Sequence, residues 1–252
     1  NAVAACDLAA RGFDGPKNVL EGPFGYFKLF EADGSPAGVV AELGRRWFIT
    51  ELAHKPFPSG RATHGIIEGC LTLRREHGLA PDAIDRVTAH VPPLVHQLVG
   101  RPPQEKMQAN YARLCAPYVA ACALRRGGVT LDDFTPTAYR DPPTQALARR
   151  VSIEVRDAGN PNALTPVEVE IALRDGSRYA RRIETVYGNP AKPLSRADQL
   201  AKFKRNCAAA ARPVPPERVE RLVACIDRLE AVADVSELMD LPICANGRDL
   251  PT

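Results

Sequence analysis

Apolar residues recur every three or four positions in several parts of this chain, which is the spacing of one face of an α-helix. The pattern predicts helices over residues 1–10, 62–76, 106–126, 195–210 and 217–232. Gly12, Gly78 and Gly127 follow three of these helices, and glycine often ends a helix because it adopts the left-handed conformation without strain. Ser195 is placed to cap the helix that it precedes.

Other segments alternate polar and apolar residues, as a β-strand covered on one face does. Together with short apolar runs, the alternation predicts strands at 47–49, 85–91, 151–155, 166–173 and 178–186. Asp175-Gly176 between the last two is a hairpin signal. The middle of the chain therefore carries three or four strands, mostly antiparallel, between helical segments. This order predicts an α+β fold, with the outer segments belonging to a helical domain that the chain enters twice.

The segment His54-Lys55-Pro56-Phe57-Pro58-Ser59-Gly60-Arg61-Ala62-Thr63-His64 brings a cation, a stiff turn and an imidazole close together. The two prolines fix φ near −65° and favour extended geometry before them, so Lys55 is expected in a rigid loop. Ser59 or Thr63 is expected to cap the following helix, with His64 near its start. Such a helix start suits a carboxylate or phosphate. The alternative is an ordinary loop-to-helix junction with a surface lysine and a packed histidine.

The 252 residues are 45% hydrophobic and 25% charged, which is typical of a globular protein. A formal net charge of +3 and five scattered Arg-Arg pairs, without interleaved aromatic residues, argue against nucleic-acid binding. No apolar run approaches the ~20 residues of a membrane span, and no signal peptide opens the chain. Seven cysteines without a Cys-x-x-Cys pair predict reduced, mostly buried thiols in a cytoplasmic protein.

Five motifs in this order and spacing resemble the MmgE/PrpD family. They are residues 8–16 with 20–22, residues 55–58 with His64, residues 116–120 around Tyr118, residues 188–190 with 193–195, and Lys202-Phe203. The resemblance runs from Asn1 to about residue 211, and it is the set of motifs that makes it specific. The family includes 2-methylcitrate dehydratase, cis-aconitate decarboxylase and iminodisuccinate epimerase.

The resemblance implies a two-domain fold, with an α+β lid domain inserted between segments of an all-helical domain. Residues 51–188 would form the lid, and residues 1–50 and 189–252 would be segments of the helical domain. It also implies a homodimer in the cytoplasm and no metal or organic cofactor. Because the chain starts inside a helical pattern and without Met, we expect the earlier part of the helical domain to precede Asn1.

The same resemblance marks Lys55, His64 and Tyr118 as candidate catalytic residues. Lys55 matches a lid lysine that points into the cleft, where an ammonium would stabilise negative charge developing next to a carboxylate. His64 has the ordinary pKa of a general acid or base, and the alternative is a helix-start histidine bonded to backbone. Tyr118 could donate to a substrate hydroxyl or carboxylate, and the alternative is a core tyrosine bonded to a carbonyl.

Three further residues are weaker candidates for substrate binding. Arg61 and Arg113 could each clamp a carboxylate with two parallel hydrogen bonds, although surface exposure is the commoner role. Gly25 lies in a loop broken by Gly22, Pro23 and Gly25 itself, and it is expected to serve backbone shape, with Phe24, Tyr26 and Phe27 tucked beneath the loop.

The first functional hypothesis is a cofactor-independent dehydratase of small di- or tricarboxylates, similar to 2-methylcitrate dehydratase. Epimerisation or isomerisation by return of the same proton is a second hypothesis. Decarboxylase-like members place another histidine near position 60, where this chain has Gly60, so that reaction is less favoured. A third hypothesis, from a different class, is a non-catalytic chain that binds carboxylates or pairs with another subunit.

Overall fold

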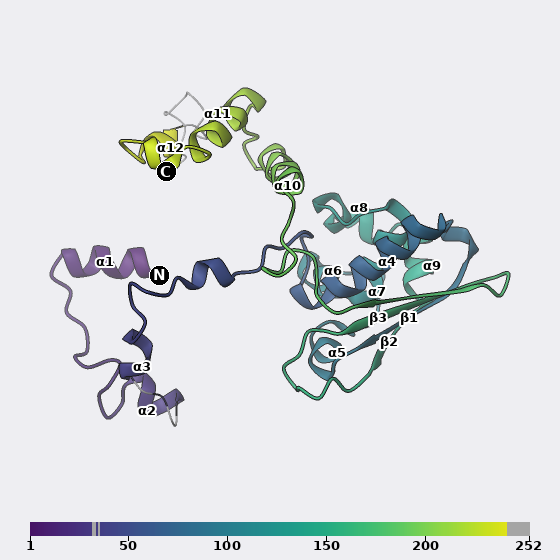
Figure 1. Cartoon of the computed structure of the whole chain (residues 1–252), viewed down its shortest axis with the longest axis horizontal. Coiled ribbons are helices and arrows are strands. Elements are labelled where there is room, and N and C mark those ends of the chain that lie inside the picture. Colours follow the sequence, from purple (N-terminus) through teal and green to yellow (C-terminus); the bar gives the residue numbers. More distant parts are fainter. Residues whose placement is uncertain (32–33, 35, 241–252) are drawn as a thin grey trace. The chain divides into compact units, whose positions relative to one another are not determined.

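The computed structural model describes residues 1–240 apart from 32–33 and 35 (Figure 1). The chain divides into two compact units, Asn1–Leu52 and Ala53–Thr252. The three-part division predicted from the sequence, with boundaries after residues 50 and 188, stays a prediction.

The first unit consists of short helices joined by turns. They are α1 (Ala2–Ala10), α2 (Tyr26–Phe30), α3 (Pro36–Val40) and the 3-10 helix η1 (Phe48–Glu51). The predicted strand at 47–49 is therefore wrong, because β-prone residues form a strand only where a neighbouring strand pairs with them. Phe24 and Tyr26 are exposed rather than tucked beneath their loop, and only Phe27 of the three is half-buried.

The second unit is built on a four-stranded sheet in the order β2-β1-β3-β4. Its strands are β1 (Ile84–Val91), β2 (Val151–Val155), β3 (Val167–Leu173) and β4 (Arg178–Ile183). β1 pairs with β2 in parallel and with β3 in antiparallel, and β3 and β4 form the predicted hairpin. Gly176 turns that hairpin at φ +91°, a conformation that favours glycine. The predicted α+β fold is confirmed.

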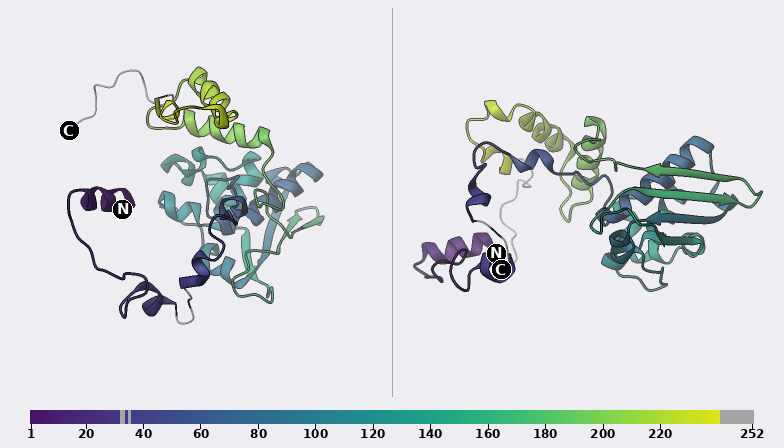
Figure 2. Two further views of the ribbon diagram at one scale, coloured as in Figure 1. Left: turned by 60° about the vertical axis from the view of Figure 1, so that its left-hand side comes forward. Right: turned by 60° about the horizontal axis from the view of Figure 1, so that its bottom comes forward.

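Two helices pack on the buried face of this sheet (Figures 1 and 2). α4 (His64–His77) lies against β3 and β4, and α7 (Ala116–Arg126) lies against β2 and α4. Gly65 and Gly69 let α4 approach the sheet closely, since a Cβ on Gly69 would lie 2.6 Å from Val169 Cγ2. Residues from Ala116 to Leu124 are all buried, so α7 forms the centre of the core.

Smaller helices complete this unit around the sheet and α7. They are η2 (Arg61–Thr63), η3 (Pro81–Ala83), α5 (Pro93–Val99), α6 (Ala109–Arg113), η4 (Leu131–Phe134), α8 (Pro136–Tyr139) and α9 (Pro142–Ala148). The single helix predicted over 106–126 is in fact α6 and α7. Pro117 has no backbone N–H, so it cannot continue the hydrogen bonds of α6, and it lies in the first turn of α7 instead. Cys115, between the two helices, is extended, with φ −96° and ψ 96°.

The C-terminal helices are α10 (Arg196–Ala208), α11 (Pro216–Ile226), η5 (Leu229–Ala231) and α12 (Glu237–Asp240). Ser195 caps α10 as predicted, because its hydroxyl accepts the Asp198 N–H at 3.1 Å. α11 ends before residue 232, the predicted end of that helix. In the described part of the chain, no helix is long and apolar enough to cross a membrane.

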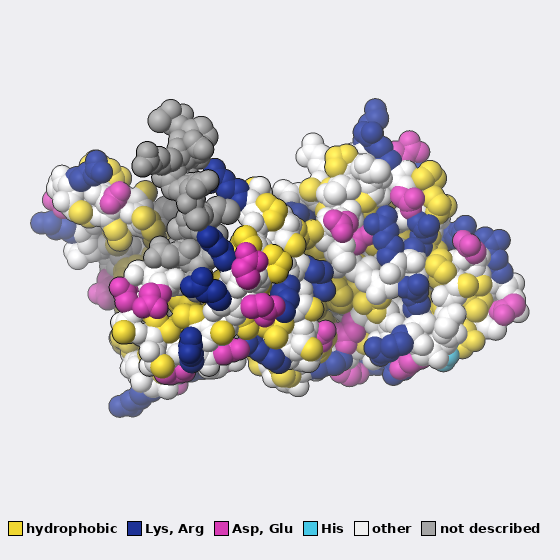
Figure 3. All heavy atoms as spheres, turned by 90° about the horizontal axis from the view of Figure 1, so that it is seen from above, with side chains coloured by type: hydrophobic (Ala, Val, Ile, Leu, Met, Phe, Trp, Pro, Cys, Tyr) yellow, Lys and Arg dark blue, Asp and Glu magenta, His cyan; other side chains and the backbone are white. Residues whose placement is uncertain are grey.

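Two sequence expectations concern the charged and the sulfur-containing residues. Lys and Arg side chains are spread among acidic ones over the face shown in Figure 3, rather than gathered in one strip. Cys70, Cys115 and Cys122 are buried, whereas Cys6 is exposed and Cys207 and Cys225 are half-buried. Cys244 lies outside the described residues. Burial of the thiols thus holds only for the core of the second unit.

Candidate functional site

The loop that carries Lys55 faces helix α10 across a cavity of about 570 Å³, which we call the Lys55 cavity. Lys55 and Phe57 line it from the loop, Asp132 from the start of η4, and Lys202, Arg205 and Asn206 from α10. Three cationic side chains therefore share the cavity wall with one carboxylate. A cavity of this size and charge suits a small anion.

The Lys55 loop is held by its own short-range hydrogen bonds. The exposed Lys55 ammonium donates to the Ser59 carbonyl at 3.4 Å, and the hydroxyls of Ser59 and Thr63 lie 2.8 Å apart. Thr63 Oγ1 also donates to the Gly60 carbonyl at 2.8 Å. Neither hydroxyl caps α4, contrary to the prediction, because the 3-10 turn η2 precedes that helix and occupies the Thr63 hydroxyl.

A backbone contact joins this loop to the chain that leads into α10. The N–H of His54 donates to the Gly188 carbonyl at 2.7 Å, and Gly188 N–H donates to the Lys192 carbonyl at 2.8 Å. Gly188 has φ +90°, and a Cβ there would lie 2.0 Å from the His54 carbonyl oxygen. Only glycine fits this position without a shift. Gly188 therefore helps to place the two walls of the cavity relative to each other.

His64 is the first residue of α4, as predicted, and it is fully buried. Within the described chain neither ring nitrogen has a hydrogen-bond partner, and the Phe57 ring meets the imidazole edge-on at 5.5 Å. Burial, followed by the charge of Arg61, lowers the pKa of His64 to about 4, with the Ser59 backbone opposing the shift. The imidazole is therefore neutral at pH 7. Phe57 lines the cavity, and His64 does not.

The two arginine candidates lie beside this loop but do not line the Lys55 cavity. Arg61 is half-buried, and its buried Nη1 has no hydrogen-bond partner among the described residues. Burial lowers the pKa of Arg61, and the carboxylate of Glu68 opposes that effect. The Arg113 guanidinium lies 5.5 Å from the centre of the Phe134 ring, and the Arg113 carbonyl accepts the Gly60 N–H at 2.9 Å.

Tyr118 lies fully inside the core, and its hydroxyl donates to the Asp133 carbonyl at 2.6 Å. This arrangement matches the alternative role that the sequence offered for Tyr118, a core tyrosine whose hydroxyl is bonded to a carbonyl. Burial is the first cause that raises the pKa of Tyr118. The hydrogen bond supports η4, of which Leu131 and Asp132 line the Lys55 cavity. Tyr118 thus contributes to the cavity through the wall that it holds.

Gly25 belongs to the first unit, whose position relative to the cavity is not defined. A Cβ at Gly25 would lie 2.7 Å from the Leu20 carbonyl oxygen, and the Gly25 N–H donates to the Gly22 carbonyl at 2.8 Å. The structure therefore gives Gly25 a role in backbone shape, as expected.

Sequence reasoning did not assign a site role to Lys202, Arg205, Asn206 or Asp132. Lys202 and Arg205 are three residues apart on a predicted helix, so their shared face could have been read from the sequence. That this face is opposite Lys55 depends on the fold of the chain around Gly188.

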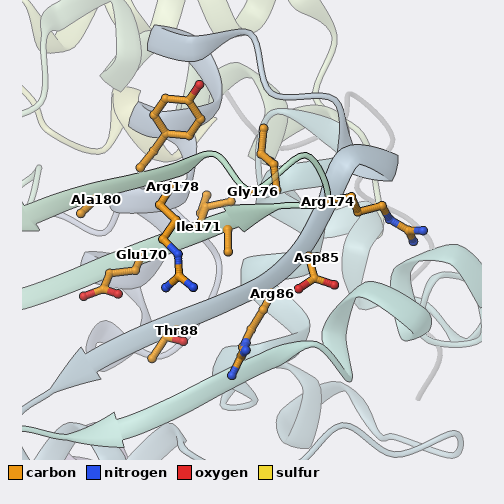
Figure 4. Close-up of a pocket in the computed structure, with 12 residues that line it drawn as sticks. Asp85, Arg86, Thr88, Glu170, Ile171, Arg174, Gly176, Arg178 and Ala180 are labelled. Atoms are coloured by element: carbon orange, nitrogen blue, oxygen red, sulfur yellow. The ribbon is translucent and has the colours of Figure 1, made fainter.

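A second and larger cavity, of about 660 Å³, lies on the other face of the sheet. Figure 4 shows Arg178 and Glu170 projecting from β4 and β3 beside Arg86 and Thr88 of β1. Nearby, His90 lies between two carboxylates, 3.6 Å from Glu154 and 3.4 Å from Glu170. None of the candidate residues lines this cavity, whose lining mixes arginines with carboxylates. We therefore take the Lys55 cavity as the candidate site.

Within the described residues, no three His, Cys, Asp or Glu side chains are arranged so that they could hold a metal ion.

Comparison with known proteins supports the resemblance stated above. A family model, the MmgE/PrpD C-terminal domain, matches residues 57–228. The chain is 30% identical to cis-aconitate decarboxylase of Mus musculus over 250 residues, which are 95% of this chain and 49% of that protein. It is also 30% identical to the Homo sapiens enzyme, over 95% of the chain and 50% of that protein. A cis-aconitate decarboxylase of Aspergillus terreus is 26% identical, over 94% of the chain and 51% of that protein. The chain thus spans about half the length of these relatives.

Proposed function

Because this chain belongs to the MmgE/PrpD family, we propose that it is part of a lyase that acts on small di- or tricarboxylates. The observation that carries the proposal is the Lys55 cavity, in which Lys55 faces the cationic side of α10. The comparisons support a lyase through the decarboxylases that the chain resembles.

Loss of a proton or of CO₂ next to a carboxylate leaves negative charge on carbon and on the carboxylate oxygens. A fixed cation at that position lowers the barrier, and removing one preorganised electrostatic group typically costs about 10²–10³ in kcat. Lys55 has the required features, because two prolines stiffen its loop and its ammonium donates to a neutral backbone carbonyl, that of Ser59. We therefore assign charge stabilisation to Lys55.

His64 supplies a neutral imidazole that could accept a proton. The Phe57 ring contacts this imidazole edge-on and lines the cavity, whereas His64 does not line it. Proton transfer between His64 and a ligand in the cavity would therefore require a rearrangement that exposes the imidazole. A bound polycarboxylate would raise the pKa of His64, since nearby negative charge favours the imidazolium. Substrate binding would thereby make His64 a stronger base.

Two reactions are candidates. The relatives are named for loss of CO₂ from cis-aconitate. Gly60 argues against loss of CO₂, because the second histidine of decarboxylase-like members would stand near this position, and it leaves elimination of water, as in a 2-methylcitrate dehydratase, or epimerisation open. A Cβ on Gly60 would lie 2.6 Å from Leu114 Cδ2, so a histidine does not fit here unless Leu114 moves. We put dehydration first and decarboxylation second.

The test is an assay of the protein with citrate, 2-methylcitrate and cis-aconitate. A dehydratase produces the ultraviolet absorbance of a new conjugated double bond, and a decarboxylase releases CO₂. A change of optical rotation without either signal would identify an epimerase. Lys55→Ala should lower kcat/KM at least about 100-fold, whereas Lys106→Ala, at an exposed lysine outside the cavity, should leave it unchanged.

Equal activity of Lys55→Ala and the unmodified protein would remove Lys55 from the site. Binding of all three acids without turnover would favour the non-catalytic alternative, a chain that binds carboxylates or pairs with another subunit. The homodimer implied by the family stays a prediction, to be measured by light scattering.

A further inference from the structure

One face of α10 forms a wall of the Lys55 cavity. Lys202, Arg205, Asn206 and Ala209 follow the three- and four-residue spacing of a single helix face, and all four line the cavity. Lys202 is half-buried and Arg205 is exposed. The cationic part of this face is therefore within reach of any ligand that Lys55 contacts.

The other cations of α10 form ion pairs with carboxylates, which distinguishes them from the two cations that face the cavity. Arg196 pairs with Asp227 of the turn after α11, and Lys204 pairs with Glu220 of α11. Among the described residues, Lys202 and Arg205 form no ion pair with a carboxylate. Arg205 helps to lower the pKa of Asp198, an effect led by the Ser195 hydroxyl, without an ion pair to it. The two cations that face the cavity are thus the ones left available for an anion.

The start of α10 is fixed by hydrogen bonds. Asp198 Oδ2 accepts the hydroxyls of Tyr187 at 2.5 Å and Ser195 at 2.6 Å, and the Ser195 N–H donates to Tyr187 Oη at 2.8 Å. One residue after Tyr187, Gly188 accepts the His54 N–H beside Lys55. These bonds run without interruption from the Lys55 loop to the first turn of α10. The separation of the two cationic walls is therefore set by the fold.

Charge and size limit the ligand that both walls can hold. The volume of about 570 Å³ is within the range of small-molecule sites, roughly 300–1,000 Å³. A carboxylate near Asp132 would be repelled, so the anionic groups of a ligand belong at the Lys55 wall and at the α10 wall. Arginine adds a planar fork that can bind a carboxylate with two hydrogen bonds.

We propose that Lys202 and Arg205 form a second carboxylate-binding point opposite Lys55, which makes the cavity select acids with at least two carboxylates over monocarboxylates. This inference rests on the proposed function of the cavity and names the part of it that recognises the substrate. Lys55 binds one carboxylate next to the reacting carbon, and the face of α10 binds the additional one.

The test is isothermal titration of the protein with glutarate and with pentanoate, which has the same five-carbon chain but lacks the second carboxylate. We expect the unmodified protein to bind glutarate at least about tenfold more tightly, as one added charged contact allows. The double variant Lys202→Gln/Arg205→Gln should lose most of this preference while its affinity for pentanoate changes little. Lys204→Gln, on the same helix but outside the cavity, should keep it.

A double variant that retains the preference overturns the inference, as does an unmodified protein that binds both acids equally or binds neither. Circular dichroism and urea midpoints check that each variant is folded. The inference and the proposed function fail in different ways. Selective binding that depends on Lys202 and Arg205, without turnover, removes the lyase and keeps the second binding point. Turnover with the same KM in the double variant as in the unmodified protein keeps the lyase and removes the second binding point.

Discussion

The backbone N–H of His54 donates a hydrogen bond to the carbonyl of Gly188, at 2.7 Å, across 134 positions of the chain. This contact brings the residue before Lys55 against the residue that starts the turn into α10. Both walls of the Lys55 cavity are thereby anchored at one point, which makes that point the place to test how the cavity is assembled.

Replacing Gly188 by alanine should destabilise the second unit and weaken ligand binding in the cavity. The positive φ alone costs about 1–2 kcal/mol for a residue with a Cβ, and the contact with the His54 carbonyl adds to it. Urea denaturation gives the change in the free energy of unfolding. Gly176→Ala is the matched control, because Gly176 has φ +91° and nothing within 4 Å of a Cβ. If Gly188→Ala costs no more than Gly176→Ala, the contact does not constrain the cavity.

His64 should make the stability of this protein depend on pH between about 4 and 6.5. Its pKa in the folded state, about 4, is below the 6.5 of an unperturbed histidine, so the unfolded chain binds the proton first as pH falls. Stability is complete above pH 6.5 and decreases toward pH 4, at up to about 1.4 kcal/mol per pH unit. His64→Leu should flatten this part of the profile in denaturation measured at several pH values, and His96→Gln, at an exposed histidine, should not. An identical profile for His64→Leu would contradict the assignment.

Tyr118→Phe should lower the free energy of unfolding by about 1–3 kcal/mol, because it leaves the buried Asp133 carbonyl without its donor. The reference is Tyr179→Phe, since in the described structure the Tyr179 ring stacks on His77 and its hydroxyl has no hydrogen bond. Thermal or urea denaturation of both variants measures the difference. If Tyr118→Phe keeps full stability but loses activity, Tyr118 acts on the substrate in a conformation different from this one.

Gly69→Ala tests the close approach of α4 to the sheet. The added methyl would lie 2.6 Å from Val169 Cγ2, and overpacking of this kind costs about 1–3 kcal/mol, offset in part by the better helix propensity of alanine. In a Val169→Ala background the same substitution should cost less, because the opposing methyl groups are gone. Equal costs in the two backgrounds, measured in a double-mutant cycle, would show that the two residues do not compete for space.

Local sequence signals predicted several boundaries of the fold well. α4 ends at Gly78 and α7 at Gly127, both in the left-handed conformation, and Ser195 caps α10. Each of these features depends on a few neighbouring residues. The pattern failed where a distant partner decides the conformation. Residues 47–49 have strand character but no strand beside them, and the periodicity of 106–126 continues across a break at Cys115.

The candidate site follows the same division. The sequence by itself determined the proline-stiffened loop at Lys55, the histidine at the start of α4 and the cationic spacing of Lys202 and Arg205, because these are properties of adjacent residues. Only the tertiary structure decided which of them meet. It placed α10 opposite Lys55 through Gly188, put the Tyr118 hydroxyl on a core carbonyl, and set the Phe57 ring edge-on against His64. The physical reason is that hydrogen-bond satisfaction and burial depend on atoms far apart in the chain, which the spacing of residues along it does not specify.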